Sequence, residues 1–443
     1  MRHPVLPRDP PLTDAETTSV GVRRFCRSQA VGTIEIPNDF YWEATHLRIA
    51  LSIRARAAAT LCGMTAALAI AGCGGKQTIK DPLIGEFDSM TGPQSTFGTS
   101  THNGEMIAID DVNASGGIDG HKVGLKLYDD QCDPAIAATV VRKLISQDHV
   151  SAVLGEVAST RSIAAAPECD KGKVPMISPS STNPKVTNGH PYVFRVCFID
   201  PFQGAAAAKF AIETLHFKTA AIFTDQANDY STGLSGVFKD TFTKMGGKIV
   251  AESSYRSGTD VNFQAQLNTI KTANPQIIYV PGYYNDIGPI AKQARQIGMA
   301  TPLLGGDGWD SDKLVEGAGG PGGAVEGCYF TNHYSVDNPD PLTQKFVKAY
   351  QAKYGSKPDS LAALGYDAAG VMLDAMKKAG APADGDYASP AYRDKLKDAI
   401  AATQGFKGAT GIINLGPDHN AVKPCVVLQI HGKDFKYVGT VQP

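Results

Sequence analysis

Short apolar segments alternate with longer amphipathic segments along nearly all of the chain from residue 83 onward. The apolar segments predict strands at residues 83–87, 123–127, 150–155, 175–177, 220–224, 248–251, 277–280 and 302–305. The amphipathic segments between them predict helices at 103–112, 134–145, 160–169, 202–215, 233–245, 263–273 and 289–297. Such alternation is typical of parallel sheets whose right-handed crossovers place helices on both faces.

These strand–helix units are too many for one ordinary open sheet, so the pattern predicts an α/β protein with two doubly wound lobes. Beyond residue 331 helices dominate, at 342–354, 361–379 and 392–402. The chain then closes with a predicted hairpin in which residues 426–430 pair with residues 435–438.

The N-terminal part contains a segment that looks like a lipoprotein signal peptide at residues 51–72. Arg54 and Arg56 form its basic region, and residues 57–72 carry no charge. This apolar run is shorter than the roughly 20 residues of a transmembrane helix, and it ends at Cys73 in an Ile-Ala-Gly-Cys motif that resembles a bacterial lipobox. We therefore expect cleavage before Cys73 and a lipid anchor on it. A buried helix that happens to end at a cysteine is the alternative.

Residues 1–50 precede this signal and mix Pro, Arg, Asp and Glu without apolar periodicity. Two interpretations stay open. Either translation starts further along the chain, and residues 1–50 are not native, or they form a disordered extension.

Composition excludes several classes of protein. Of the 443 residues, 42% are hydrophobic and 19% are charged, as in globular proteins. A net charge of −2 without a basic stripe argues against a nucleic-acid partner. The sequence has no G-x-S-x-G, H-E-x-x-H or P-loop motif, and its cysteines have no zinc-site spacing. We expect no cofactor, no metal and no enzymatic activity.

Polar residues follow several predicted strands, at the sheet edge where open α/β sheets bind ligands. Ser159 follows one strand and begins a helix, where its hydroxyl and free backbone N–H groups suit an anion. A plain N-cap role fits Ser159 equally well. Ser180, Ser181 and Thr182 form a second polar loop, between two prolines, that could present N–H groups to a carboxylate or be a simple turn.

Two segments of the second half follow strands in the same way. Tyr283 lies in one of them, and Asp307, flanked by glycines, lies in the other. Asp307 could approach a ligand ammonium group closely, although taken alone a turn aspartate is the commoner role for such a residue.

Together these loops resemble those of the type I periplasmic-binding-protein family, in its leucine/isoleucine/valine-binding branch of ABC-transporter solute receptors. The resemblance runs from about residue 84 to the C-terminus. Its motifs are Met90-Thr91-Gly92-Pro93, Asp110-Asp111-Val112-Asn113, Gly116-Gly117-Ile118-Asp119-Gly120, Tyr128-Asp129-Asp130, Pro179-Ser180-Ser181-Thr182, Asp225-Gln226 through Tyr230, Tyr366-Asp367-Ala368 and Lys407-Gly408-Ala409-Thr410-Gly411.

The resemblance implies a domain organisation and a ligand site. Residues 80–200 and 332–411 would form lobe 1, residues 201–331 and 412–443 lobe 2, with a multi-strand hinge between them. Ser159, the backbone of Ser180 beside Ser181, and Thr182 would bind an α-carboxylate. Asp307 would pair with an α-ammonium group, and Tyr230, Tyr283 and Phe97 would contact the ligand.

The resemblance also extends to the cysteines. Cys132 matches the family's Tyr-Asp-Asp-x-Cys-Asp-Pro motif, but its usual partner position holds Ala158. We expect a disulfide between Cys169 and Cys197, beside adjacent strands of one lobe, and a contact between Cys328 and Cys425 near the hinge.

The sequence thus predicts a monomeric, lipid-anchored solute-binding protein of the periplasm or cell envelope. It would bind an amino acid, branched-chain or otherwise apolar, and deliver it to the membrane permease of an ABC importer. One alternative is a receptor for another small carboxylate or an amide. A ligand-sensing ectodomain of the same fold is a second, and a hydrolase is a distant third.

Overall fold

The computed structural model describes residues 78–443. The predicted extension at 1–50, the signal peptide at 51–72 and the anchor Cys73 lie outside these residues.

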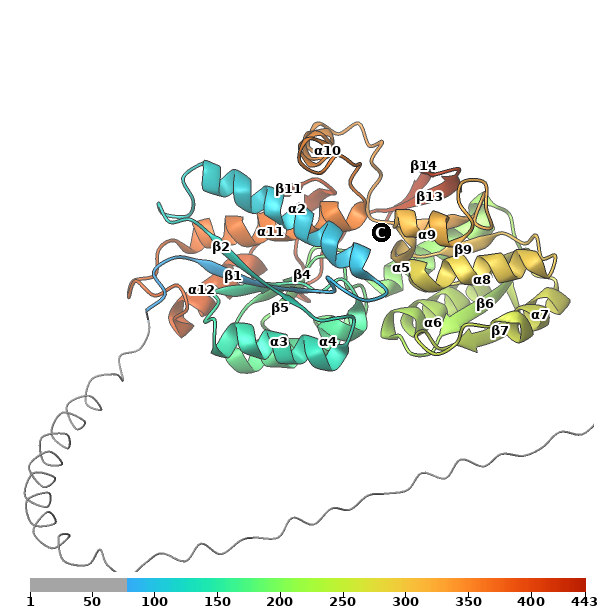
Figure 1. The fold of residues 1–443 in the computed structure, drawn as a ribbon, viewed down its shortest axis with the longest axis horizontal. Coiled ribbons are helices and arrows are strands. Elements are labelled where there is room, and N and C mark those ends of the chain that lie inside the picture. Colours follow the sequence, from blue (N-terminus) through green and yellow to red (C-terminus); the bar gives the residue numbers. More distant parts are fainter. Residues whose placement is uncertain (1–77) are drawn as a thin grey trace, which may run out of the picture. The chain divides into compact units, whose positions relative to one another are not determined.

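The first lobe is built on a five-stranded parallel sheet (Figure 1). Its strand order is β2-β1-β3-β4-β5. The strands are β1 (Leu83–Asp88), β2 (Gly124–Asp129), β3 (Ala152–Leu154), β4 (Met176–Ser178) and β5 (Val193–Arg195). The helices of this lobe are α2 (Ser95–Ala114), α3 (Pro134–Ser146), α4 (Ser159–Gly172), α10 (Pro341–Tyr354), α11 (Ser360–Ala379) and α12 (Pro390–Ala401).

These helices cover both faces of the sheet, as the crossover pattern requires. One hydrophobic cluster joins the sheet to α2, α11 and α12, and includes Ile84, Ile109 and Met372. A second cluster joins the opposite face to α3 and α4, and includes Phe87 and Leu144. The two α/β layers are visible in Figure 1 as α2 with α11 on one side of the sheet and α3 with α4 on the other.

The second lobe contains a seven-stranded sheet of order β14-β13-β10-β9-β8-β6-β7. Its strands are β6 (Thr219–Asp225), β7 (Lys248–Tyr255), β8 (Ile277–Tyr279), β9 (Leu303–Gly305), β10 (Tyr329–Asn332), β13 (Cys425–His431) and β14 (Asp434–Val441). Strands β6 to β10 are parallel, whereas β13 is antiparallel to both β10 and β14. The helical elements are α5 (Asp200–Lys209), η2 (Phe210–Thr214), α6 (Asp229–Lys244), α7 (Gln264–Ala273), α8 (Tyr284–Gln296), η3 (Asp307–Trp309) and α9 (Asp312–Gly317).

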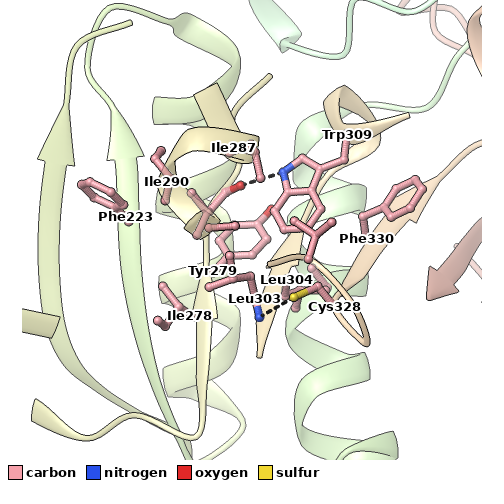
Figure 2. Close-up of a cluster of buried hydrophobic side chains, with 14 of the residues drawn as sticks. Phe223, Ile278, Tyr279, Ile287, Ile290, Leu303, Leu304, Trp309, Cys328 and Phe330 are labelled. Carbon is pink, nitrogen blue, oxygen red and sulfur yellow. Dashed lines mark hydrogen bonds between the residues drawn. The ribbon is translucent and has the colours of Figure 1, made fainter. Parts of the chain in front are cut away.

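The core of this lobe includes side chains of β8, β9, β10 and α8 (Figure 2). Trp309 is its largest side chain and is fully buried. Its indole N–H donates to the Val280 carbonyl at 3.1 Å (Figure 2). Trp309 thereby fixes the short helix η3 to the core of the lobe.

The chain passes between the lobes three times: between β5 and α5, between β10 and α10, and between β12 and β13. Before the last passage, β11 (Phe406–Gly408) and β12 (Gly411–Ile413) form a small antiparallel pair. Asp367 on α11 accepts hydrogen bonds there from Ala409 N at 2.5 Å and Thr410 N at 3.0 Å. Two segments whose motifs resemble those of the family, Tyr366-Asp367-Ala368 and Lys407 to Gly411, are therefore hydrogen-bonded to each other just before the third passage between the lobes.

The predicted α/β fold with two lobes is confirmed, and so is the C-terminal hairpin. Two helices begin five or more residues earlier than predicted. Helix α2 starts at Ser95 rather than at residue 103, and α8 starts at Tyr284, so that Pro289 lies inside it. The start of α2 is rich in Ser, Thr and Gly, which favour turns over helices, and burial of Phe97 and Thr101 outweighs that preference.

The predicted disulfide between Cys169 and Cys197 is wrong, because both residues are free thiols. The Cys169 sulfur lies 3.7 Å from the Met176 sulfur, and the Cys197 sulfur lies 3.5 Å from the Ser181 carbonyl oxygen. They belong to the two hydrophobic clusters on opposite faces of the first sheet, so the sheet itself separates them.

The remaining three cysteines of the described region are also free. The Leu303 N–H approaches the Cys328 sulfur at 3.4 Å (Figure 2). The Cys425 thiol lies 3.4 Å from the Val426 carbonyl oxygen. We expected Cys328 and Cys425 to contact each other, and they do not form a disulfide. Cys132 is half-buried.

Within residues 78–443, none of the helices combines the length and the apolar character needed to cross a membrane. The same part of the chain contains no cluster of His, Cys, Asp or Glu side chains arranged to hold a metal ion.

Candidate functional site

A small cavity of about 10 Å³ lies between the two lobes. Both lobes contribute its walls, which are Phe97, Val157, Ser159, Ser180, Thr182 and Leu361 from the first and Tyr230, Tyr283, Asp307 and Gly308 from the second. All of the ligand residues predicted from the sequence lie here except Ser181. In this closed arrangement the cavity would hold about one water molecule. It is far smaller than the roughly 300–1,000 Å³ of ligand pockets, so side chains or whole lobes must move to admit a solute.

The first lobe contributes hydrogen-bond donors at one end of the cavity. Ser159 is the first residue of α4, and the N-cap position is Ala158, which offers no side-chain cap. The alternative that Ser159 is itself the N-cap is therefore excluded. Its buried hydroxyl accepts a hydrogen bond from the Asn183 N–H at 3.1 Å, which leaves the hydroxyl hydrogen available to a ligand.

The loop after β4 supplies two further donors. Ser180 and Thr182 line the cavity, and their N–H groups have no acceptor within residues 78–443. Together with the N-terminus of α4, whose dipole favours negative charge, these groups give one end of the cavity the donors that suit an anion.

Ser181 does not line the cavity. Its hydroxyl lies 2.8 Å from the Glu156 carbonyl oxygen and 2.7 Å from the Ser162 hydroxyl, inside the first lobe. Its own carbonyl accepts a hydrogen bond from Arg195 at 2.6 Å. Ser181 therefore joins the two loops that carry Ser159, Ser180 and Thr182, and it is not among the residues that line the cavity.

The second lobe places one carboxylate at the other end. Asp307 follows β9 at the first position of η3, which Trp309 holds in the core. No side chain would fit at Gly305, because a Cβ there would overlap the Trp309 indole. The glycine therefore permits the close packing that fixes Asp307 at the cavity wall.

Asp307 is only 5% exposed and is held by neutral donors. Its Oδ1 accepts hydrogen bonds from Gln203 Nε2 at 2.8 Å and from the Tyr230 hydroxyl at 2.8 Å. The Gly308 N–H donates to that hydroxyl at 3.1 Å and orients it. Burial raises the pKa of Tyr230 well above its usual value, so the phenol stays protonated and remains a donor.

Aromatic and aliphatic side chains form the walls between the two polar ends. The rings of Tyr230 and Tyr283 stack with centroids 5.1 Å apart. Phe97 of the first lobe meets Tyr283 edge-on at 5.8 Å and Tyr284 at 4.9 Å, so aromatic contacts bridge the lobes. With Leu361 in the wall as well, the middle of the cavity suits an apolar group.

Hydrogen bonds across the rim show that the lobes are closed. Lys185 of the first lobe donates to the Asp229 side chain at 2.9 Å. The Asn183 side-chain amide donates to the Asp229 backbone carbonyl at 2.8 Å. On another side, the Tyr284 hydroxyl donates to the Pro93 carbonyl at 2.9 Å. A ligand in this cavity would be cut off from bulk water, which strengthens its electrostatic contacts.

Sequence reasoning missed Gln203, His333, Val157 and Leu361. Gln203 lies on α5, and His333 directly follows β10, but neither belongs to a loop that lines the cavity. Both act through Asp307, and only the packing of the second lobe brings them to it. Val157 and Leu361 carry no chemical signal in the sequence, because apolar wall residues look like any core residues.

Comparison with known proteins shows the family to which this chain belongs. A profile of the family described as periplasmic binding protein matches residues 83–434. The leucine-, isoleucine-, valine-, threonine- and alanine-binding protein of Pseudomonas aeruginosa is 30% identical over 351 residues, which is 78% of this chain and 91% of that protein.

Two solved structures are similar over the same region. The crystal structure of a leucine-binding protein LivK from Thermotoga maritima shares 41% identity and a TM-score of 0.76, covering 82% of this chain and 99% of that one. The branched-chain amino acid transporter substrate-binding protein LivJ from Streptococcus pneumoniae, solved in complex with isoleucine, shares 33% identity and a TM-score of 0.76, covering 82% of this chain and 100% of that one.

Proposed function

Because the chain belongs to the periplasmic binding protein family, we propose that it is the extracytoplasmic solute receptor of an ABC importer. Its ligand is an amino acid with an apolar side chain, of the branched-chain class. The Pseudomonas aeruginosa relative is named for leucine, isoleucine, valine, threonine and alanine, and the Thermotoga maritima relative for leucine. The Streptococcus pneumoniae relative was solved with isoleucine, and these ligands together support the proposed class.

One observation carries the proposal: the cavity has N–H and hydroxyl donors at one end and a single buried carboxylate at the other. An α-carboxylate at the first end and an α-ammonium group at Asp307 would compensate each other's charge. Such compensation matters, because an unpaired buried charge costs several kcal/mol. A ligand with only one of the two charged groups would leave one end of the cavity unsatisfied.

Binding at this site would also favour closure. The proposed carboxylate contacts come from the first lobe and the ammonium contact from the second, so a ligand reaches all of them only in the closed state. Its differential affinity then shifts the equilibrium between open and closed lobes. The closed, loaded receptor is the form that would meet the permease.

The proposed location rests on a sequence motif that lies outside residues 78–443. The lipobox-like motif favours an anchor at Cys73 in the cell envelope, with the receptor acting as a monomer on a membrane permease. The cavity provides binding groups, and we propose transport rather than catalysis as its role.

A thermal-shift screen of the purified protein tests the ligand class. The panel holds the twenty amino acids and two matched analogues of leucine: 4-methylpentanoate, which lacks the ammonium group, and isoamylamine, which lacks the carboxylate. A ligand at several hundred times its dissociation constant should stabilise the fold by about 3–4 kcal/mol. Stabilisation by apolar amino acids and by neither analogue is expected. Stabilisation by acids without an ammonium group would contradict the role of Asp307.

A further inference from the structure

His333 contacts the carboxylate that faces the cavity. It follows β10, in the second passage between the lobes, and its side chain is completely buried. The Nε2 atom lies 3.1 Å from Asp307 Oδ2. The imidazole stacks on Phe198 at 3.7 Å with an angle of 25° between the rings, which fixes its plane.

The contact assigns the tautomer of the imidazole. The second ring nitrogen, Nδ1, has no hydrogen-bond partner among residues 78–443. A carboxylate only accepts hydrogen bonds, so Nε2 carries the hydrogen of the neutral ring and donates it to Asp307. Nδ1 is then the atom that would take up a second proton.

The bonds to Asp307 leave room for one more donor. A carboxylate offers about four acceptor positions. Gln203 and Tyr230 occupy two of them at Oδ1, and His333 occupies one at Oδ2. All three donors are neutral, so the negative charge of Asp307 stays available to a single cation.

We propose that His333 is a positioning residue for the ammonium acceptor Asp307, and that protonation of His333 lowers the affinity of the receptor for its amino acid. This inference rests on the proposed function. A protonated His333 pairs with Asp307 and compensates its charge inside the protein. A ligand ammonium group would then add a second positive charge beside one carboxylate, and that charge would be buried without compensation.

The surrounding groups set the pH range of this effect. Lys423, from the third passage, and Asp307 are the charged groups that face His333. Burial lowers the pKa of His333 from its usual value, against the opposing influence of Asp307, so the transition lies below pH 6.5. The charge of Lys423 lowers the pKa further.

The other titratable groups near Asp307 stay neutral over that range. Burial raises the pKa of Asp200 to about 8 and that of Cys197 to about 12. It also raises the pKa values of Cys425 and of the phenols Tyr230, Tyr279 and Tyr283, which face Asp307. Affinity should therefore follow the protonation of His333 as the pH falls below 6.5.

Isothermal titration calorimetry with L-leucine from about pH 7.5 to about pH 4.5 tests the proposal on the wild type and His333→Gln. Glutamine keeps an N–H donor where Nε2 lies but takes up no proton in this range. The wild type should lose affinity by about tenfold or more, within the 5- to 150-fold usual for coupled sites. Whatever its affinity at the upper pH, His333→Gln should lose a smaller factor of affinity between the two pH values than the wild type.

The number of protons released when leucine binds is a second measurement. It would not change if His333 had only a structural role. In buffers of different ionisation enthalpy, the wild type should release a fraction of a proton on binding leucine near the transition, and His333→Gln should release less. His121→Gln, which removes an exposed histidine paired with Asp81 at 2.8 Å, is the matched control and should behave as the wild type.

Two outcomes would overturn the inference in different ways. Identical pH profiles and proton release in the wild type and His333→Gln would contradict the role of His333 while leaving the proposed function intact. Absence of amino-acid binding by the wild type at the upper pH would contradict the proposed function and the inference together.

Discussion

The chemistry of this cavity depends on which hydrogen-bonding groups are already used. Asp307 has donors on three sides, yet all of them are neutral and none satisfies its charge. The Ser159 hydroxyl accepts a hydrogen bond from the Asn183 N–H, so its own hydrogen remains available to a ligand. The site is thus complete except for one cation and one anion, which is the charge pattern of a zwitterion.

Replacing Ser159 by alanine should weaken amino-acid binding by about 1–3 kcal/mol, because a buried partner of the ligand carboxylate is lost. Titration calorimetry of the variant with L-leucine measures this change. Ser389→Ala is the control: it removes an equally buried hydroxyl that caps α12 and does not line the cavity. It should lower the melting temperature while leaving the affinity close to that of the wild type. Unchanged affinity in Ser159→Ala would exclude the hydroxyl as a ligand contact.

At the scale of single residues, the sequence predicted those cavity residues whose position is set by the end of a strand. Ser159, Ser180, Thr182 and Asp307 all follow strand ends, and the family motifs added the aromatic residues. The orientation of a side chain is different, because it depends on neighbours from distant segments. Ser181 turns into the first lobe, and His333 reaches Asp307, through contacts that no local pattern contains.

At the scale of elements, the close approach of α2 and α11 shapes the first lobe. A Cβ at Gly104 would overlap the Ala362 carbonyl oxygen, and one at Gly365 would overlap the Thr101 carbonyl oxygen. The two helices therefore meet backbone to backbone. This crossing orients the first turn of α2, which carries Phe97 to the cavity, and places Leu361 in the cavity wall.

Gly104→Ala should destabilise the protein by about 1–3 kcal/mol, the usual cost of overpacking, even though alanine favours helices over glycine by about 1 kcal/mol. Gly236→Ala is the matched control. Gly236 is exposed within α6, and a Cβ there would meet no atom within 4 Å. It should stabilise the protein by about 0.5–1 kcal/mol. Urea unfolding measures both changes, and a gain in stability for Gly104→Ala would contradict the described helix crossing.

The cysteines show why element order is not enough to predict a disulfide. Cys169 and Cys197 are close to adjacent strands, but they lie on opposite faces of the sheet. Addition of dithiothreitol should leave the melting temperature of the protein unchanged, since no bond within residues 78–443 is available for reduction. A fall in the melting temperature would reveal a disulfide that contributes to stability.

At the scale of the whole molecule, buried carboxyl groups are unusually prominent. Burial raises the pKa of Asp200 to about 8, and those of Glu156, Asp286 and Asp359 to about 7. The folded state therefore binds these protons more tightly than the unfolded chain does. Their stabilising effect is complete below about pH 4 and is lost as the pH rises through the folded pKa values of about 7–8.

Calorimetric melting should accordingly give a higher melting temperature at about pH 5 than at about pH 8. The lowered pKa of His333 acts in the opposite direction below pH 6.5, but it is one group against several carboxyl groups. Asp200→Asn should reduce the difference between the two pH values, because the amide mimics the protonated carboxyl group. Asp240→Asn, on the exposed side of α6, should leave it unchanged. A melting temperature that is higher at pH 8 would contradict this account.

The two-lobed architecture followed from the alternation of strands and helices, because each apolar segment needs a sheet and each amphipathic segment needs a face to cover. The closed arrangement of the lobes did not follow from it. Closure rests on contacts such as Lys185 with Asp229 and Tyr284 with Pro93, which join segments far apart in the sequence.

The central claim is that one cavity binds an amino acid with Asp307 as the acceptor of its ammonium group. Titration of L-leucine into the wild type and into Asp307→Asn, at about pH 7.5, tests it most directly. The wild type should bind, and the variant, which keeps the shape of the side chain but loses its charge, should lose binding by at least the roughly 3–5 kcal/mol that breaking a buried ion pair costs. Equal affinities in the two proteins would contradict the claim.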